Sequence, residues 1–125
     1  GASLTALSSC TKEYITNYLP SQTMVYTRVL NDWQGTDNRA YLDLTVAELS
    51  DYYVKQGVVT LAISMDNEKT YMTIPATYEG IAYSYDYQAG SVRIYAQDPI
   101  VENVFVEVPA KVVIKVSLTD ADYVQ

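Results

Sequence analysis

The most apolar stretch of this sequence is Gly57-Val58-Val59-Thr60-Leu61-Ala62-Ile63-Ser64-Met65. As a β-strand it would place the large apolar side chains of Val59, Leu61, Ile63 and Met65 on one face, with small or apolar groups on the other. A strand that tolerates burial on both faces is typical of the centre of a sheet. We therefore expect a central strand here.

Before this strand, the pattern predicts two further strands and a helix. Residues 24–30 are rich in β-formers, residues 33–38 suggest a loop, and residues 40–46 alternate as in a half-buried strand. The sequence Thr45-Val46-Ala47-Glu48 has capping-box spacing, and Gly57 is a typical helix stop. We therefore expect one short helix near residues 46–56.

After the central strand, the sequence predicts strands separated by turns. Residues 69–74 form a strand that ends at Pro75, and residues 81–97 form a hairpin with its turn at Gln88-Ala89-Gly90. Two valine-rich strands follow, the first carrying Val104, Val106 and Val108 and the second running from residue 112 to 118. Together these segments predict a mainly β protein, a single antiparallel β-sandwich of the immunoglobulin-like kind with seven to eight strands.

The N-terminal stretch predicts a membrane anchor. Residues 2–7 are small and apolar like the tail of a signal peptide, and Leu7-Ser8-Ser9-Cys10 resembles the lipobox of bacterial lipoproteins. By that resemblance Cys10 becomes the first mature residue and carries a lipid, which attaches the protein to a membrane. The alternative is an ordinary amphipathic helix over residues 4–19. We expect a signal-peptide remnant and lipobox at 1–10, a flexible tether at 11–22 and the sandwich at 23–125.

Composition argues against several classes of function. Eight basic residues lie singly among fifteen acidic ones, for a net charge of −7, so no basic patch follows a nucleic-acid backbone. The chain has no histidine and one cysteine, which excludes a Ser-His-Asp triad and a Cys/His zinc site. Acidic turn residues do not fit an EF-hand. We expect no enzyme, no cofactor and no metal; a carboxylate-dependent glycosidase is the remaining enzymatic alternative.

Tyrosine is the unusual feature, at thirteen residues. Tyr83, Tyr85 and Tyr87 share one face of a strand, and Tyr95 and Trp33 come near them if the hairpin and the loop fold together. Such rings could stack on sugars or anchor a protein, and the alternative is that they pack half-buried. We expect a non-enzymatic binding or structural module for a protein partner, with a glycan-binding module that uses the tyrosine row as the alternative.

The order of motifs resembles a family of small uncharacterised lipoproteins from Bacteroidetes-type bacteria. The resemblance covers about residues 40–118 and rests on Gly57-Val58-Val59, Ile74-Pro75, Tyr83-Ser84-Tyr85, Gly90-Ser91-Val92-Arg93-Ile94 and the valine-rich C-terminal strand. It implies a sandwich domain in the cell envelope, lipid-anchored to the outer membrane on its periplasmic face or at the cell surface. It carries over no catalytic or ligand-binding residue.

Overall fold

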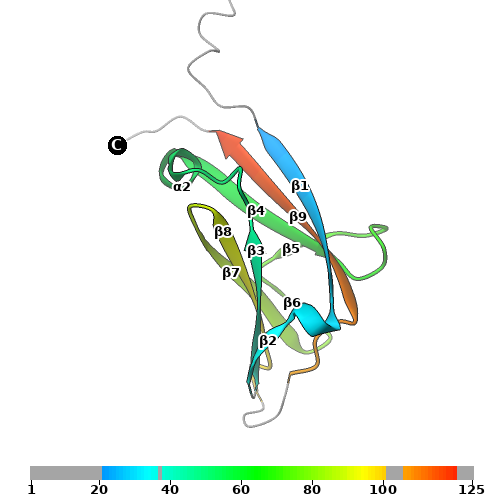
Figure 1. Cartoon of the computed structure of the whole chain (residues 1–125). Helices are drawn as coiled ribbons and strands as arrows, with labels where there is room; N and C mark the ends of the chain where they lie inside the picture. Colours follow the sequence, from blue (N-terminus) through cyan, green and yellow to red (C-terminus); the bar gives the residue numbers. More distant parts are fainter. Residues whose placement is uncertain (1–20, 37, 101–105, 121–125) are drawn as a thin grey trace, which may run out of the picture.

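The computed structural model describes residues 21–36, 38–100 and 106–120, which form a β-sandwich of two antiparallel sheets (Figure 1). The four-stranded sheet has the order β1 (Gln22–Val29), β9 (Lys111–Asp120), β4 (Gly57–Ser64) and β5 (Met72–Ile74). The five-stranded sheet has the order β2 (Gln34–Thr36), β3 (Arg39–Thr45), β8 (Ser91–Gln97), β7 (Ile81–Gln88) and β6 (Ala76–Tyr78). The mainly β sandwich predicted from the sequence is confirmed.

The predicted central strand is β4, which lies between β9 and β5. Its inward residues Val59, Leu61 and Ile63 are at most 3% exposed. Its outward Ser64 is also buried, because the following loop folds back: the Ser64 hydroxyl donates to Asp66 Oδ1 at 2.8 Å and accepts from the backbone N–H of Glu68 at 2.9 Å. β4 is therefore buried on both faces only in its second half, at Ala62 and Ser64, whereas the outward Val58 and Thr60 are exposed.

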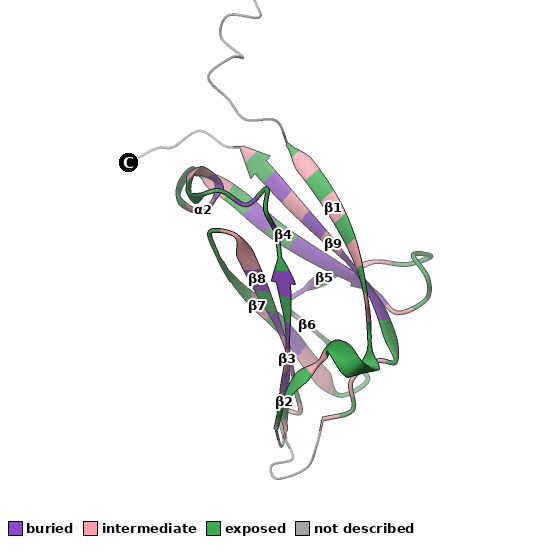
Figure 2. Cartoon of the chain, viewed as in Figure 1, coloured by how far each residue is buried: buried purple, intermediate pink, exposed green. Residues whose placement is uncertain are grey.

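The hydrophobic core lies between the two sheets (Figure 2). Alternate residues of the longer strands point inward, and burying each large apolar side chain contributes about 1.5–3 kcal/mol. The largest fully buried side chains are Leu42, Leu44, Val46, Leu49, Tyr53, Leu61, Val92, Ile94, Val112, Ile114, Val116 and Leu118. Tyrosine thus contributes to the core as well as to the surface.

The helix is shorter than the sequence predicted. It is α2 (Asp51–Gln56), with Ser50 as its N-cap, whereas we expected it to start near residue 46. The backbone N–H of Val46 donates to the carbonyl of Gly90 at 2.9 Å, and the N–H of Gly90 donates to the carbonyl of Leu49 at 2.8 Å. The backbone groups of Val46 and Leu49 thus bond to Gly90 in the β7–β8 turn. Residues 46–49 therefore do not belong to the helix, and the capping-box prediction was wrong.

The described residues form nine strands, compared with seven to eight predicted for the whole sandwich. Two strands of three residues, β2 and β6, lie where we expected a loop and a connection, and β5 begins at Met72, three residues later than predicted. The β2–β3 hairpin is close-packed at Gly35, whose φ is +113° and where a Cβ would lie 2.5 Å from the carbonyl oxygen of Arg39. Residues 106–110 do not form the predicted valine strand, and residues 101–105, which include Val104, lie outside the described chain.

The predicted anchor lies outside the described residues. Residues 1–20 include Cys10, the lipobox and all but the last two residues of the predicted tether, and β1 begins at Gln22. In the described part of the chain, no helix is long and apolar enough to cross a membrane.

Candidate functional site

The tyrosine row lies on the inner face of the five-stranded sheet. Tyr83, Tyr85 and Tyr87 do share a face of β7, as the alternation predicted, but that face turns toward the core. Tyr83 is 4% exposed, Tyr85 is half-buried, and Tyr87 at the end of the strand is 36% exposed. The rings of Tyr85 and Tyr87 are stacked, with centroids 6.2 Å apart and planes at 24°. The row is therefore largely a packing feature.

The chemistry of the inner tyrosines agrees with this position. Burial, helped by the nearby Glu79 carboxylate, raises the pKa of Tyr83 to about 12. Burial also raises the pKa of Tyr85, whose hydroxyl crosses the core and donates to the carbonyl of Val59 on β4 at 2.7 Å. A platform for sugars needs exposed rings, and Tyr83 does not provide one.

The structure does not bring the five predicted residues into one site. Tyr95 points from β8 to the opposite, outer face of the sheet, where it pairs with Tyr41 and Ser84 on the neighbouring strands. Trp33 packs at the edge of the core, and its buried Nε1 has no hydrogen-bond acceptor among the described residues. Of the five, Tyr95 lies on the polar outer face, and Tyr87, at the exposed end of β7, lines the same pocket as Tyr95.

That surface site is on β3, β8 and β7, and we call it the Arg-Tyr face. It comprises Arg39, Tyr41 and Asp43 on β3, Arg93 and Tyr95 on β8, and Ser84 and Asp86 on β7. Strand register sets Asp43, Arg93 and Asp86 in one cross-strand row, and Tyr41, Tyr95 and Ser84 in the next. Successive side chains of a strand point to opposite faces of the sheet. Because the residues between them point into the core, these residues point outward.

Two arginines of the Arg-Tyr face lie on tyrosine rings. The guanidinium of Arg39 is 4.2 Å from the ring centroid of Tyr95, and that of Arg93 is 4.3 Å from the ring centroid of Tyr41. The attraction of a cation for the ring quadrupole contributes about 0.5–1 kcal/mol at exposed positions such as these. Each arginine thus reaches across to the ring of the tyrosine on the other strand.

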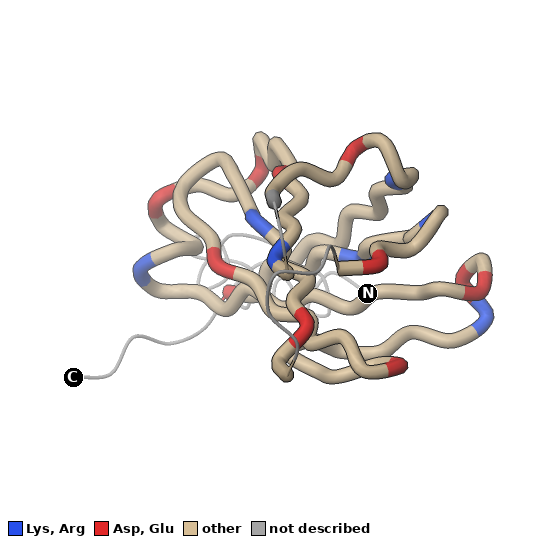
Figure 3. Tube along the Cα trace, turned by 90° about the horizontal axis from the view of Figure 1, so that it is seen from below, with Lys and Arg blue, Asp and Glu red and all other residues tan. Residues whose placement is uncertain are grey.

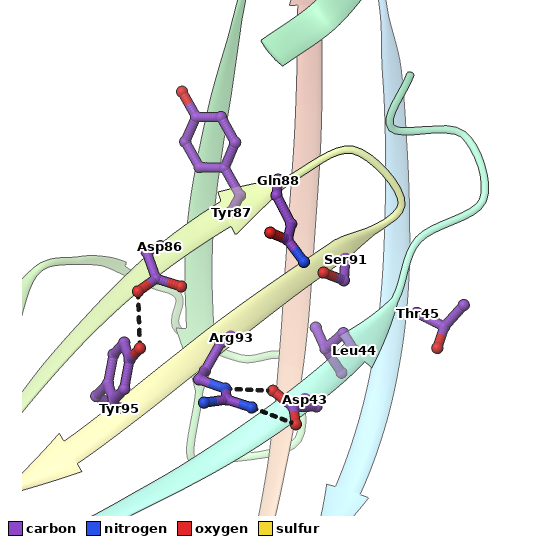
Figure 4. Close-up of a pocket in the computed structure, with 9 residues that line it drawn as sticks. All are labelled: Asp43, Leu44, Thr45, Asp86, Tyr87, Gln88, Ser91, Arg93 and Tyr95. Atoms are coloured by element: carbon purple, nitrogen blue, oxygen red, sulfur yellow. Dashed lines mark hydrogen bonds and ion pairs between the residues drawn. The ribbon is translucent and has the colours of Figure 1, made fainter. Parts of the chain in front are cut away.

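Hydrogen bonds fix the acidic end of the Arg-Tyr face. Arg93 donates through Nε and a terminal nitrogen to the two oxygens of Asp43 at 2.6 and 3.0 Å, while the Tyr95 hydroxyl donates to Asp86 at 2.7 Å (Figure 4). The hydrogen bond that Arg93 donates to Asp43 is the main cause that raises the pKa of Arg93, and the bond that Tyr95 donates to Asp86 is the main cause that raises the pKa of Tyr95. Both groups therefore keep their protons at neutral pH.

Two shallow pockets open on this face and share Arg93 and Tyr95. One has a volume of about 540 Å³ and the other about 320 Å³. The larger is lined by Asp43, Leu44, Thr45, Asp86, Tyr87, Gln88, Ser91, Arg93 and Tyr95, and the smaller by Gly35, Arg39, Tyr41, Arg93 and Tyr95. Their linings offer hydrogen-bond donors and acceptors side by side, which suits recognition of a polar ligand.

Cations also lie on tyrosine rings of the other sheet: Lys115 is 4.1 Å from the ring centroid of Tyr71, whose hydroxyl donates to Glu68, and Arg28 is 5.5 Å from that of Tyr26. Basic positions are scattered among acidic ones around the chain trace (Figure 3). Within the described residues, no group of three or more His, Cys, Asp or Glu side chains could hold a metal ion.

Of the residues on the Arg-Tyr face, the sequence patterns indicated only Tyr95 as a site residue. A signal is present, because Arg39-Ala40-Tyr41 and Arg93-Ile94-Tyr95 repeat the pattern Arg-x-Tyr. Reading it requires knowing that the two strands are neighbours and that Tyr41 lies opposite Tyr95.

Comparisons with protein-family models, with curated proteins and with solved structures find no match to this chain.

Proposed function

We propose that this chain is a lipid-anchored protein of the cell envelope whose β-sandwich is a non-enzymatic binding module for a protein partner. The observation that carries the proposal is the Arg-Tyr face, a preorganised set of two arginines and two tyrosines on a rigid sheet. Sites built on strands are held more precisely than sites on loops, which favours recognition.

The composition of the face favours a protein as the partner. Tyrosine and arginine are the residues that most often carry binding energy at protein interfaces. The guanidinium groups cover one side of the Tyr41 and Tyr95 rings, which reduces the ring surface left for stacking on sugars. The glycan alternative also loses its original basis, because Tyr83 is buried.

A crosslinking experiment tests the binding surface. A photo-reactive amino acid replaces Ser84, which is exposed on the Arg-Tyr face, in cells that make the protein; the matched control replaces Thr60, which is exposed on the outer face of the other sheet. We expect a discrete crosslinked protein from position 84 and none from position 60. No crosslink at position 84, or equal crosslinks at both, would contradict the proposed surface.

The anchor is tested separately. We expect Cys10→Ser to move the protein from the membrane fraction to the soluble fraction and to abolish incorporation of a labelled fatty acid. Unchanged fractionation would contradict the lipid anchor without affecting the binding surface.

Turnover tests the non-enzymatic part of the proposal. We expect no hydrolysis of glycan or peptide substrates by the purified protein, and sustained turnover that is lost on substitution of a carboxylate would overturn it.

A further inference from the structure

The Arg-Tyr face has a local two-fold arrangement with one unmatched position. On the antiparallel pair β3 and β8, Tyr41 lies opposite Tyr95, Arg93 opposite Asp43, and Arg39 opposite Gln97. A two-fold axis between the tyrosines therefore relates Arg39 to Arg93 and relates Gln97 to Asp43. Both halves have the arginine on the tyrosine, but only one half has the carboxylate.

The half with the carboxylate shows what the other half can bind. Asp43 accepts two hydrogen bonds from Arg93, which is the paired geometry that a planar guanidinium and a carboxylate favour. Arg39 is held in the matching position on Tyr95 and is exposed, and no carboxylate of the described residues is paired with it. Its guanidinium donors, which bond to none of the described residues, are thus presented beside the Tyr95 ring.

We propose that Arg39 binds a side-chain carboxylate of the protein partner, so that an aspartate or glutamate of an acidic segment takes the position corresponding to Asp43. The inference rests on the proposed protein-binding function and adds the chemistry of the partner. The smaller pocket, lined by Gly35 with no side chain and by Arg39, Tyr41 and Tyr95, leaves room beside the guanidinium.

The net charge of the chain affects the distance over which an acidic partner can be attracted. The chain has a net charge of −7, which repels an acidic partner at long range, but charges are screened beyond about 8 Å at physiological ionic strength. Binding of a carboxylate therefore depends on local contact with Arg39.

Nuclear magnetic resonance can observe Arg39 directly. The chain has three arginines, Arg28, Arg39 and Arg93, so the Cys10→Ser protein gives three Nε–H signals. Arg28 is on the other sheet and serves as a reference, and Arg93 Nε–H is already donated to Asp43. The probe is a capped tetraglutamate peptide, with tetraglutamine as its uncharged match. We expect tetraglutamate to shift the Arg39 signal saturably, and tetraglutamine not to shift it.

The two-fold arrangement supplies matched variants. Gln97→Asp places a carboxylate opposite Arg39 as Asp43 is opposite Arg93, and we expect it to weaken tetraglutamate binding about tenfold or more. Asp43→Gln releases Arg93, and we expect the Arg93 signal then to respond as well. Both positions are exposed, and the backbone amide spectrum verifies that each variant is folded.

The results separate this inference from the proposed function. An Arg39 signal that ignores tetraglutamate, or a Gln97→Asp variant that binds it unchanged, would overturn the inference. Tighter binding of oligogalacturonate than of tetraglutamate at Arg39 would also overturn it, in favour of an acidic glycan. If the crosslink from position 84 persists in Gln97→Asp, the proposed binding surface is supported but the carboxylate inference is contradicted. If the wild-type protein gives no crosslink from position 84, the proposed function itself is contradicted.

Discussion

Tyr83 and Tyr95 lie on adjacent strands of one hairpin and have opposite roles. Tyr83 is opposite Ala96 and enters the core, whereas Tyr95 is opposite Ser84 and lies on the Arg-Tyr face. Both have a raised pKa, but the main cause is burial for Tyr83 and a hydrogen bond to Asp86 for Tyr95. The comparison teaches that neither residue type nor a pKa shift identifies a binding tyrosine; its neighbours do.

Truncation of Tyr83 and of Tyr95 should change the free energy of unfolding by the most unequal amounts. Tyr83→Ala removes a ring that is 4% exposed and leaves a cavity, so we expect the free energy of unfolding to fall by about 3–5 kcal/mol. Tyr95→Ala removes a partly exposed ring and should lower it by about 1 kcal/mol or less. Urea denaturation of both variants measures the difference, and similar losses would contradict the division into inner and outer tyrosines.

High pH should act on the inner tyrosine. The pKa of Tyr83 is raised from 10.0 to about 12, so its neutral form stabilises the fold fully below pH 10 and this contribution is lost as the pH rises toward 12. The loss should be roughly 2 kcal/mol, from about 1.4 kcal/mol per pKa unit less some relaxation. Denaturant titrations at several pH values on wild type and Tyr83→Phe isolate it. Parallel pH profiles for the two proteins would rule out this role of Tyr83.

Removal of the Tyr85 hydroxyl tests whether the tyrosine row stabilises the contact between the two sheets. Tyr85 donates to the Val59 carbonyl across the core at 2.7 Å, and we expect Tyr85→Phe to lower the free energy of unfolding by about 1 kcal/mol. Tyr87→Phe, at the exposed end of the same row, is the matched control and should have no measurable effect. Equal changes in thermal or urea denaturation would show that the Val59 bond does not stabilise the sandwich.

The ion pair on the outer face should contribute least. Asp43 and Arg93 are each more than 40% exposed at their side chains, so solvent screens the pair. A double-mutant cycle with Asp43→Asn and Arg93→Gln should give a coupling energy of about 0.5–1 kcal/mol, which decreases in high salt. A coupling of several kcal/mol would mean that the outer face, too, is primarily structural.

The hairpin, the central strand and the sandwich could be predicted from the sequence because each has a strong alternation. Residues 81–97 carry two alternating arms around a glycine turn, and the structure has β7 and β8 there. Three-residue strands such as β2 and β6 are too short for a pattern to appear. The predicted helix start was wrong for a different reason. The Val46 N–H donates to the Gly90 carbonyl and the Gly90 N–H donates to the Leu49 carbonyl, and these bonds between segments far apart in sequence override a local capping signal.

The candidate site was harder to predict than the fold. Alternation predicted that Tyr83, Tyr85 and Tyr87 share a face, but which face meets the core depends on where the other sheet packs. The Arg-Tyr face depends on one register, Tyr41 opposite Tyr95, which no single segment encodes. The repeated Arg-x-Tyr pattern indicates a site only when β3 and β8 are known to be neighbours.

The strand order has a consequence for when the chain can fold. In the four-stranded sheet, β9 lies between β1 and β4, and β1 pairs with β9 over all eight of its residues, from Gln22 to Val29. β1 therefore has no place in this sheet until β9 has been synthesised, and pairing so distant in sequence is slow. During synthesis this sheet remains incomplete until the ribosome has released the residues of β9, so the two sheets close on each other only after nearly all of the described chain has been made.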